Sequence, residues 1–308
     1  MTRKSITILG KTLGDLSDPR VLAAYAVVYI GVLGFLALAF GQNIIPDGGG
    51  DLPVAEQGVY MFGAFLALSH LWALGIGLLL FGAVAGANTL AREAERGTLR
   101  IVLSKQVRRW EVLLGTFVGI TLFVGLVGVA NALVGAVALF WLSDVSAAAL
   151  EVGVFDALSG TVAYALFVGG FVASLSLALS VFTKNRLQTA LGLLVVPALY
   201  FALSVARLFG PEFYEDNALY LADMSYHFGN AFVVIHEAIG GDLPVEAQQA
   251  LSIFSGVYDL PSGENQEALP ESLELAGHVD SMVSVSVLVG VAAVSFLVAL
   301  VEFQRTDL

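Results

Sequence analysis

Long apolar stretches separated by short polar segments dominate the chain. Six of them are long enough to cross a membrane as helices: Arg20–Gln42, Tyr60–Asn88, Val112–Leu142, Leu158–Phe182, Leu187–Leu208 and Ser281–Phe303. About 20 helical residues cross a hydrocarbon core of about 30 Å. The alternation of a membrane-spanning strand is absent, so we expect an all-α integral membrane protein with six transmembrane helices. The second and third stretches exceed this length and should tilt or project from the bilayer.

The N-terminal residues 1–19 follow a different pattern. Lys11 and Asp15 interrupt an apolar run that is already too short for a cleaved signal peptide. Four apolar residues recur there at helical spacing: Ile6, Leu9, Leu13 and Leu16. Pro19 then ends the helical pattern. We expect a cytosolic amphipathic elbow helix that lies along the inner membrane surface, rather than a fraying tail.

Residues 210–280, between the fifth and sixth stretches, carry 13 acidic residues and no basic one. Apolar and aromatic residues nevertheless recur there at helical spacing: Leu219, Leu221, Met224, Phe228, Phe232, Ile235 and Ile239. A second short amphipathic run starts at Pro244. We expect a small extracytoplasmic helical cap on the outer membrane surface; the alternative is a solvated loop with transient helix.

Composition agrees with a membrane protein. Only 13% of the residues are charged and 57% are hydrophobic, whereas soluble domains carry about 25% charged residues. The net charge of -12 argues against a nucleic-acid binder. An acidic, lysine-poor chain also suits a halophilic archaeon. There is no cysteine, which excludes disulfides, a zinc ribbon and a thiol nucleophile.

The connections alternate in charge. If the N-terminus is cytosolic, the inner segments hold 13 of the 14 Lys and Arg residues, and the outer segments hold 19 of the 26 acidic residues. The excess of Lys and Arg on one side predicts an N-in, C-in topology. We expect a multi-pass protein of a prokaryotic plasma membrane.

The spans offer no catalytic constellation. Their middle parts lack Asp, Glu, Lys and Arg, although ionisable residues there usually mark function. His70 alone is embedded, and we expect it to be hydrogen-bonded rather than a metal ligand. Arg207 should snorkel toward the outer interface. We therefore predict no catalytic residue, no metal site and no cofactor bound by this chain, so that any energy must arrive through a partner.

Small residues in the spans allow close helix contact. Gly82 and Gly86 form one G-x-x-x-G pair, and Gly115 and Gly119 form another. Such pairs pack helices within one chain or form a subunit interface, and both readings stay open. Pro197 should kink the fifth span.

Charge concentrates in Ala91–Glu111, "AREAERGTLRIVLSKQVRRWE", which holds six of the 14 basic residues. Several residues here and in the later "TKNR" turn suit anchoring at the inner lipid interface: Arg108, Arg109, Trp110, Lys184 and Arg186. The run also resembles the segment between the second and third helices of ABC-2-type transporter permeases. The matching residues are Glu93, Glu95, Gly97-Thr98-Leu99, Leu103-Ser104, Val107, Arg109 and Leu114-Gly115. Gln106 and Thr116 replace the Pro and Lys that are common in that family.

The resemblance covers nearly the whole chain and implies four parts. These are a cytosolic elbow (1–19), helices 1–5 with a coupling segment at 91–111 (20–209), the outer segment (210–280), and helix 6 with a cytosolic tail (281–308). It implies the permease subunit of an ATP-driven exporter, which is not itself an enzyme. The subunit would pair with a second copy or paralogue and dock on a separate cytosolic ATP-binding subunit that holds ATP and Mg.

The resemblance also implies the contact with the ATPase, formed by Glu93, Glu95, Arg96, Gly97 and Thr98. Gly97 would let the chain turn, and Thr98 could cap the next helical turn. The alternative from another class is a non-transporting membrane assembly or maturation factor, for example in metalloenzyme maturation.

Overall fold

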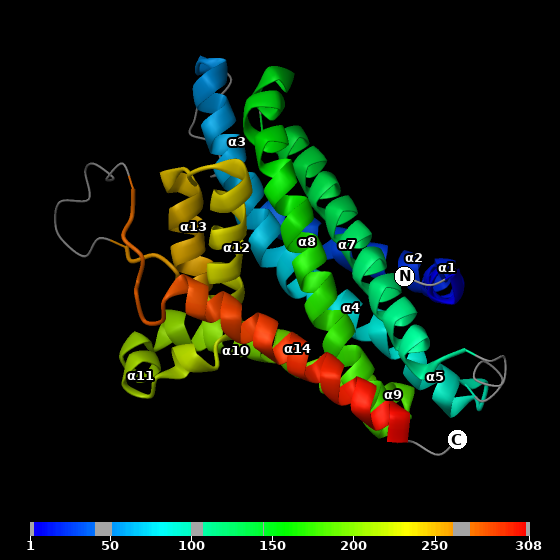
Figure 1. Ribbon diagram of the computed structural model, residues 1–308. Coiled ribbons are helices and arrows are strands. Elements are labelled where there is room, and N and C mark those ends of the chain that lie inside the picture. Colours follow the sequence, from blue (N-terminus) through cyan, green and yellow to red (C-terminus); the bar gives the residue numbers. More distant parts are fainter. Residues whose placement is uncertain (1–2, 41–50, 100–106, 144, 261–271, 306–308) are drawn as a thin grey trace.

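The computed structural model describes residues 3–40, 51–99, 107–143, 145–260 and 272–305, and most of these are helical (Figure 1). In chain order the helices are α1 (Arg3–Leu16), α2 (Pro19–Phe40), α3 (Val54–Leu68), the π-helix η3 (Ser69–Ile76), α4 (Gly77–Ala87), α5 (Leu90–Glu95), α7 (Arg109–Leu142), α8 (Ala147–Thr183), α9 (Arg186–Leu193), α10 (Val195–Phe209), α11 (Pro211–Asp216), the 3-10 helix η4 (Leu219–Leu221), α12 (Met224–Gly240), α13 (Val245–Ser255) and α14 (Ser281–Arg305). Within these ranges, the strand-like pairing is a single antiparallel bridge between Tyr258 and Leu275.

Six helical segments of the described chain are long and apolar enough to cross a membrane, which confirms the predicted number. The first is α2 and the last is α14. The second is composite, because α3, η3 and α4 follow one another without a gap. The third is α7 with 34 residues, and the fourth is α8 with 37 residues. The fifth consists of α9 and α10, which meet at Leu194; Pro197, predicted to kink this span, lacks the N–H that would bond to the carbonyl of Leu193.

The fourth apolar span, Ala157–Thr183, agrees with the predicted Leu158–Phe182, but its helix α8 begins earlier, at Ala147. Its added turns bury Ala149, Val154 and Ala157. Gly153 lies so close to the carbonyl oxygen of Gly58 in α3 that a side chain would not fit. The added turns therefore form because they pack on α3, a tertiary contact that the local apolar pattern does not reveal.

The spans form two groups that meet at one end of the molecule. In Figure 1, α3, α7 and α8 run side by side toward the top, whereas α10 and α14 cross below them. The groups converge where α5, α9 and the last turns of α14 lie, here called the α5 end. α12 and α13 occupy the space between the groups, with α12 against α8, α10 and α14 and with α13 against α3.

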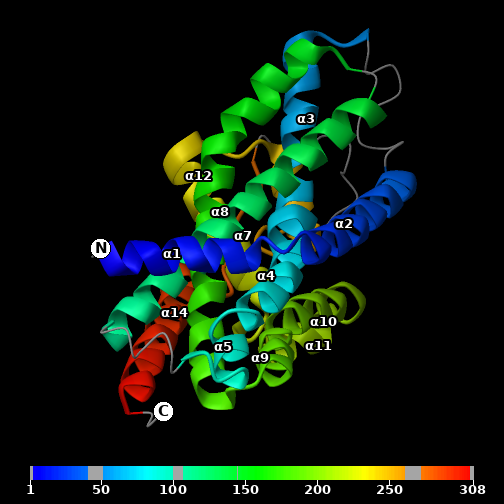
Figure 2. The ribbon, with the colours of Figure 1, turned by 90° about the vertical axis from the view of Figure 1, so that its right-hand side faces the viewer.

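The first helix, α1, lies across α7 (Figure 2). Small residues bring the two helices together: a side chain on Gly115 would meet Ser5 and Ile8, and one on Gly119 would meet Thr12. The buried residues of α1 are Ser5, Thr12 and Leu16, whereas Ile6 is exposed. The later part of the predicted apolar stripe packs on the protein through Leu13 and Leu16, whereas its first residue, Ile6, is exposed. Beside the glycines of α7, the smaller side chains of Ser5 and Thr12 are buried.

The second glycine pair also packs within the chain. Gly82 of α4 faces Val172, and Gly86 faces Ser176 of α8 and Leu193 of α9. Both predicted pairs therefore serve contacts between helices of one chain, which decides between the two readings.

The segment from 210 to 280 is folded where it is described. Asp223 begins α12, and its side chain accepts from the backbone N–H groups of Ser225 and Tyr226. α12 buries Tyr226, Phe228 and Phe232. Because these aromatic rings pack among the spans, α12 is part of the core of the molecule.

Candidate functional site

The predicted coupling residues lie on α5 and the turn that follows it. Thr89 separates α5 from α4, with a non-helical backbone and a hydroxyl that donates to the carbonyl of Gly86 at 2.6 Å. Leu90 and Leu99, on either side of the charged residues, are buried with Leu113, Leu177 and Phe303. α7, α8 and α14 thus hold both ends of the segment. Residues 100–106, which include Leu103, Ser104 and Gln106, lie outside the described residues.

Glu93 points toward α1. Its carboxylate forms an ion pair with Lys11, which also pairs with Asp15 at 3.0 Å. The side chain of Glu93 is 20% exposed and that of Lys11 48%. The ion pair ties α5 to the elbow helix, so the Glu93 carboxylate is engaged within the chain.

Glu95 points toward α9. Its carboxylate accepts from the backbone N–H of Arg186 at 3.3 Å, and the Arg186 guanidinium donates to the side-chain oxygen of Asn88 at 3.4 Å. Arg186, predicted as an interface anchor, therefore joins α9 to the junction between α4 and α5.

The turn after α5 is the exposed part of the segment. Gly97 adopts φ +70, a conformation that favours glycine, and a Cβ there would meet no other part of the protein within 4 Å. The predicted turn at Gly97 is confirmed. Arg96 and Thr98 are exposed beside it, and the Thr98 hydroxyl donates back to the Glu93 carbonyl at 3.3 Å. In the described residues this bond closes the turn, whereas the predicted capping of the next helix falls on the undescribed stretch.

Arg108 and Arg109, at the start of α7, stabilise helix ends. The backbone N–H of Arg108 donates to the Glu111 carboxylate at 2.9 Å in a capping box. The Arg109 guanidinium donates to the carbonyls of Phe303 and Gln304 at 2.8 and 2.7 Å. Those carbonyls end α14, where a cation is favourable. Trp110 is half-buried, and Lys184 is exposed in a left-handed conformation at the end of α8.

A buried polar contact lies far from the charged segment and was only partly expected. His70, in η3, is fully buried, and its Nε2 is 3.0 Å from the Tyr200 hydroxyl of α10. The same hydroxyl donates to the His70 carbonyl at 3.3 Å. The expectation of a hydrogen-bonded histidine is confirmed. Across the described chain, His, Asp and Glu side chains nowhere gather in the threes that a metal site requires. His236 of α12 is also buried, which lowers its pKa to about 4 and keeps its ring neutral.

The prediction that Arg207 snorkels toward the outer interface is wrong. Arg207 forms a largely buried ion pair with Asp223 at 2.8 Å. Its guanidinium also donates to the Ser255 carbonyl at 2.8 Å, and the Tyr214 hydroxyl donates to Asp223 at 2.8 Å. Burial and the Asp223 charge raise the pKa of Tyr214, so its hydroxyl stays protonated and can donate. This cluster could not be predicted from the sequence, because Asp223 is one of many acidic residues in its segment and nothing local distinguishes it.

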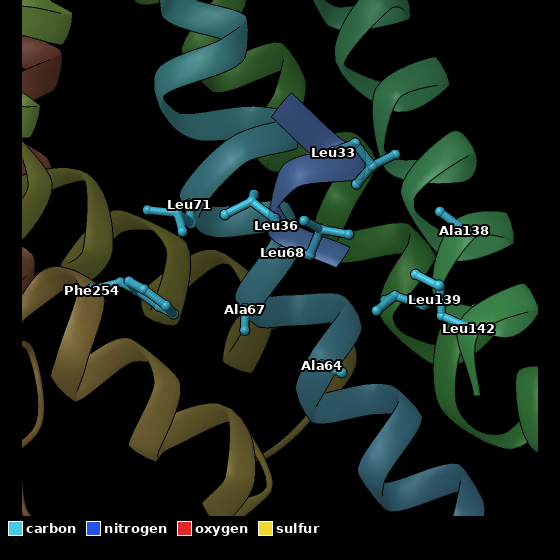
Figure 3. Close-up of a pocket in the computed structure, with 10 residues that line it drawn as sticks. All are labelled: Leu33, Leu36, Ala64, Ala67, Leu68, Leu71, Ala138, Leu139, Leu142 and Phe254. Carbon is cyan, nitrogen blue, oxygen red and sulfur yellow. The ribbon is translucent and has the colours of Figure 1, made fainter. Parts of the chain in front are cut away.

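An apolar cavity of about 220 Å³ lies between α2, α3, η3, α7 and α13 (Figure 3). Leu33 and Leu36 border it from α2, Leu68 from α3, Leu139 from α7 and Phe254 from α13. Its wall offers hydrocarbon and no charged group. A cavity of this chemistry can accept an apolar group but cannot position a charged one.

A search of curated proteins finds no match to this chain. A family model does match it, over residues 8–308, and its description is "ABC-2 family transporter protein". The match includes all six spans, the α5 segment and the helices between the fifth and sixth spans. The chain therefore belongs to the ABC-2 family of transporter proteins.

Proposed function

We propose that the chain is the permease subunit of an ATP-driven exporter, and that the turn Glu95–Thr98 is its contact with a separate ATP-binding subunit. The observation that carries this proposal is the placement of the turn. Arg96, Gly97 and Thr98 are exposed, while buried Leu90 and Leu99 hold the ends of the segment. An exposed turn whose two ends are packed in the protein can contact a partner and transmit the partner's movement to the helices.

The resemblance implies that Glu93 contacts the ATP-binding subunit, but in this proposal Glu93 holds α1 beside α5. Its ion pair with Lys11 places α1 beside α5, so a partner that seats on the turn also meets α1. We propose that α1 lies at the inner membrane surface with Ile6 toward lipid, that both termini are cytosolic, and that two such subunits pair in a plasma membrane. Membership of the family and the excess of basic residues at the α5 end support this arrangement.

Co-purification with the ATP-binding subunit tests the contact. Arg96→Glu reverses one exposed charge on the turn, and we expect about tenfold weaker retention, which corresponds to about 1.4 kcal/mol. Stimulation of ATP hydrolysis in proteoliposomes should fall with it. Arg305→Glu is the matched control, because it makes the same charge change on an exposed residue of the α5 end.

If both variants retain the ATP-binding subunit equally well, the turn is not part of the contact. A chain that never retains or stimulates an ATP-binding subunit would contradict the transport proposal and favour a non-transporting assembly factor. Insertion into the membrane should be normal for both variants, because neither residue is buried.

A further inference from the structure

The second span is broken at η3. An eight-residue π-helix replaces the regular ladder between α3 and α4, and Gly75 within it is non-helical, with φ -88 and ψ -116. A side chain on Gly75 would overlap the His70 carbonyl, and one on Gly77 would lie 2.5 Å from the Trp72 carbonyl. π-helical turns often mark functional positions and hinges. Here only glycine fits, which keeps the turn compact.

The fifth span is weakened as well where α9 meets α10: Leu194 keeps a helical backbone, but Pro197 has no N–H for the carbonyl of Leu193. The two weak points belong to one region: η3 and α4 both contact α10, and Leu193 packs against Gly86 of α4. Each weak point divides its span into a half on the α5 side and a half on the opposite side.

The halves on the α5 side are bound to one another. α4 packs on α9, Glu95 accepts from the backbone of Arg186, and Arg186 reaches Asn88. α4, α5 and α9 therefore form one unit. On α8, the side chains of Val172 and Ser176 lie against Gly82 and Gly86 of this unit, and Leu90 packs with Leu177 and Val181.

Tyr200 joins the two weak points. It lies in α10, three residues after Pro197, and its hydroxyl contacts both the Nε2 and the carbonyl of His70. With the ring proton on Nε2, the imidazole donates to the hydroxyl while the hydroxyl donates to the carbonyl, so both bonds form at once. Tyr200 and His70 are fully buried, where a lost hydrogen bond is costly.

We propose that Ser69–Ile76 is the hinge of a movable unit made of α4, α5 and α9, and that the Tyr200–His70 contact is the latch that holds this hinge. The movement of α5 by an ATP-binding subunit rests on the proposed function; the hinge and its latch do not. Displacing the unit bends the second span at Gly75 and the fifth at Leu194, while α3 and α10 stay with the opposite half.

Distance measurements between spin labels test the latch without a partner. The chain has no cysteine, so Val59→Cys and Val84→Cys place labels on exposed positions of α3 and α4, on either side of η3. Phe155→Cys and Phe182→Cys label exposed positions of the unbroken α8. In lipid nanodiscs, Tyr200→Phe should broaden the Val59–Val84 distribution or shift its mean by at least ~2 Å, more than a small helix adjustment. The Phe155–Phe182 distribution should stay unchanged.

Matched variants separate the latch from a general loss of packing. Tyr164→Phe removes another fully buried hydroxyl, which donates at 3.2 Å to the Phe228 carbonyl of α12 and not to η3, and it should leave both distributions unchanged. If Tyr200→Phe does not fold, His70→Leu should broaden the hinge distribution and His70→Gln, which keeps a donor near Nε2, should restore it. Unchanged distributions in Tyr200→Phe and His70→Leu would overturn the latch, as would equal broadening by Tyr164→Phe.

A second measurement adds the ATP-binding subunit and a non-hydrolysable ATP analogue. The Val59–Val84 distance should change when both are bound, and the Phe155–Phe182 distance should not. Binding without any change at the hinge would overturn its role in coupling. Absence of binding would contradict the proposed function instead, and the latch measurement would still decide the hinge.

Discussion

At the residue scale, Asp223 shows how a charge is accommodated inside this protein. Its fully buried carboxylate accepts from Arg207, from the hydroxyls of Tyr214 and Ser225, and from two backbone N–H groups. These partners come from α10, α11 and α12. The carboxylate therefore joins three elements and helps to fix their positions, because a buried charge tolerates few alternative partners.

We predict that Asp223→Asn destabilises the protein by about 3–5 kcal/mol, because the neutral amide leaves the Arg207 charge unpaired in a buried place. Thermal unfolding in detergent measures the effect. Asp216→Asn, which neutralises an exposed acid of α11, is the control and should change stability by less than about 0.5 kcal/mol. A similar loss of stability in both variants would show that the Arg207–Asp223 pair contributes no more than an exposed charge.

Single-residue roles were the hardest to foresee from sequence. The turn at Gly97 was predictable, since glycine tolerates positive φ. The partners of Glu93 and Arg109 were not, because each lies on a helix distant in sequence. Periodicity describes which face of a helix is apolar, and it carries no information on which other helix meets a particular charge.

At the element scale, the contact between α1 and α7 depends on glycine. A side chain on Gly115 would lie 2.8 Å from the Ser5 carbonyl and 2.9 Å from Ile8, both in α1. The two helices approach so closely because α7 offers no side chain there. Since α1 also holds Glu93 through Lys11, this contact positions α5.

We predict that Gly115→Ala separates α1 from α7 and exposes α1 to protease, and that it weakens retention of the ATP-binding subunit as α5 loses its neighbour. Gly14→Ala is the control: Gly14 lies in α1 with nothing nearby, and alanine there should stabilise the helix by about 0.5–1 kcal/mol. Limited proteolysis of both variants checks the prediction. Protection of α1 in Gly115→Ala would contradict it.

The number of spans followed from sequence because about 20 apolar residues are a sufficient signal. The break at η3 did not, because "SHLWALGIG" is mostly apolar and a π-helix leaves no periodic signal; Gly75 and Gly77 are its visible trace in the sequence. The early start of α8 was missed for a different reason: its first turns are stabilised by α3 rather than by lipid.

At the scale of the whole molecule, charge is distributed unevenly along the proposed membrane normal. The α5 end carries Arg96, Lys184 and Arg305, whereas α11 and the residues near it carry Glu212 and Glu215. The proposed N-in, C-in orientation places the first group in the cytosol. The uneven distribution was visible in the sequence, because it needs only the order of spans and a count of charges.

We predict that Arg305→Cys is labelled by a membrane-impermeant maleimide only after cells are opened, whereas Glu215→Cys is labelled in intact cells. The chain has no cysteine of its own, so each variant reports one position. Both residues are exposed, and thus accessibility depends on the side of the membrane. Labelling of both residues in intact cells, or the reverse order, would contradict the orientation.

The position of α12 has a consequence for how the protein is made. α12 packs on α8 and α10, which precede it, and on α14, which a ribosome synthesises later. The Tyr226 hydroxyl bonds to Val279, and Ser281, the first residue of α14, bonds to Asn230. The aromatic face of α12 therefore lacks one of its walls until the last span emerges. Packing of α12 is therefore complete only after α14 has been made, and a nascent chain that stalls before α14 presents quality-control proteases with an open, aromatic surface.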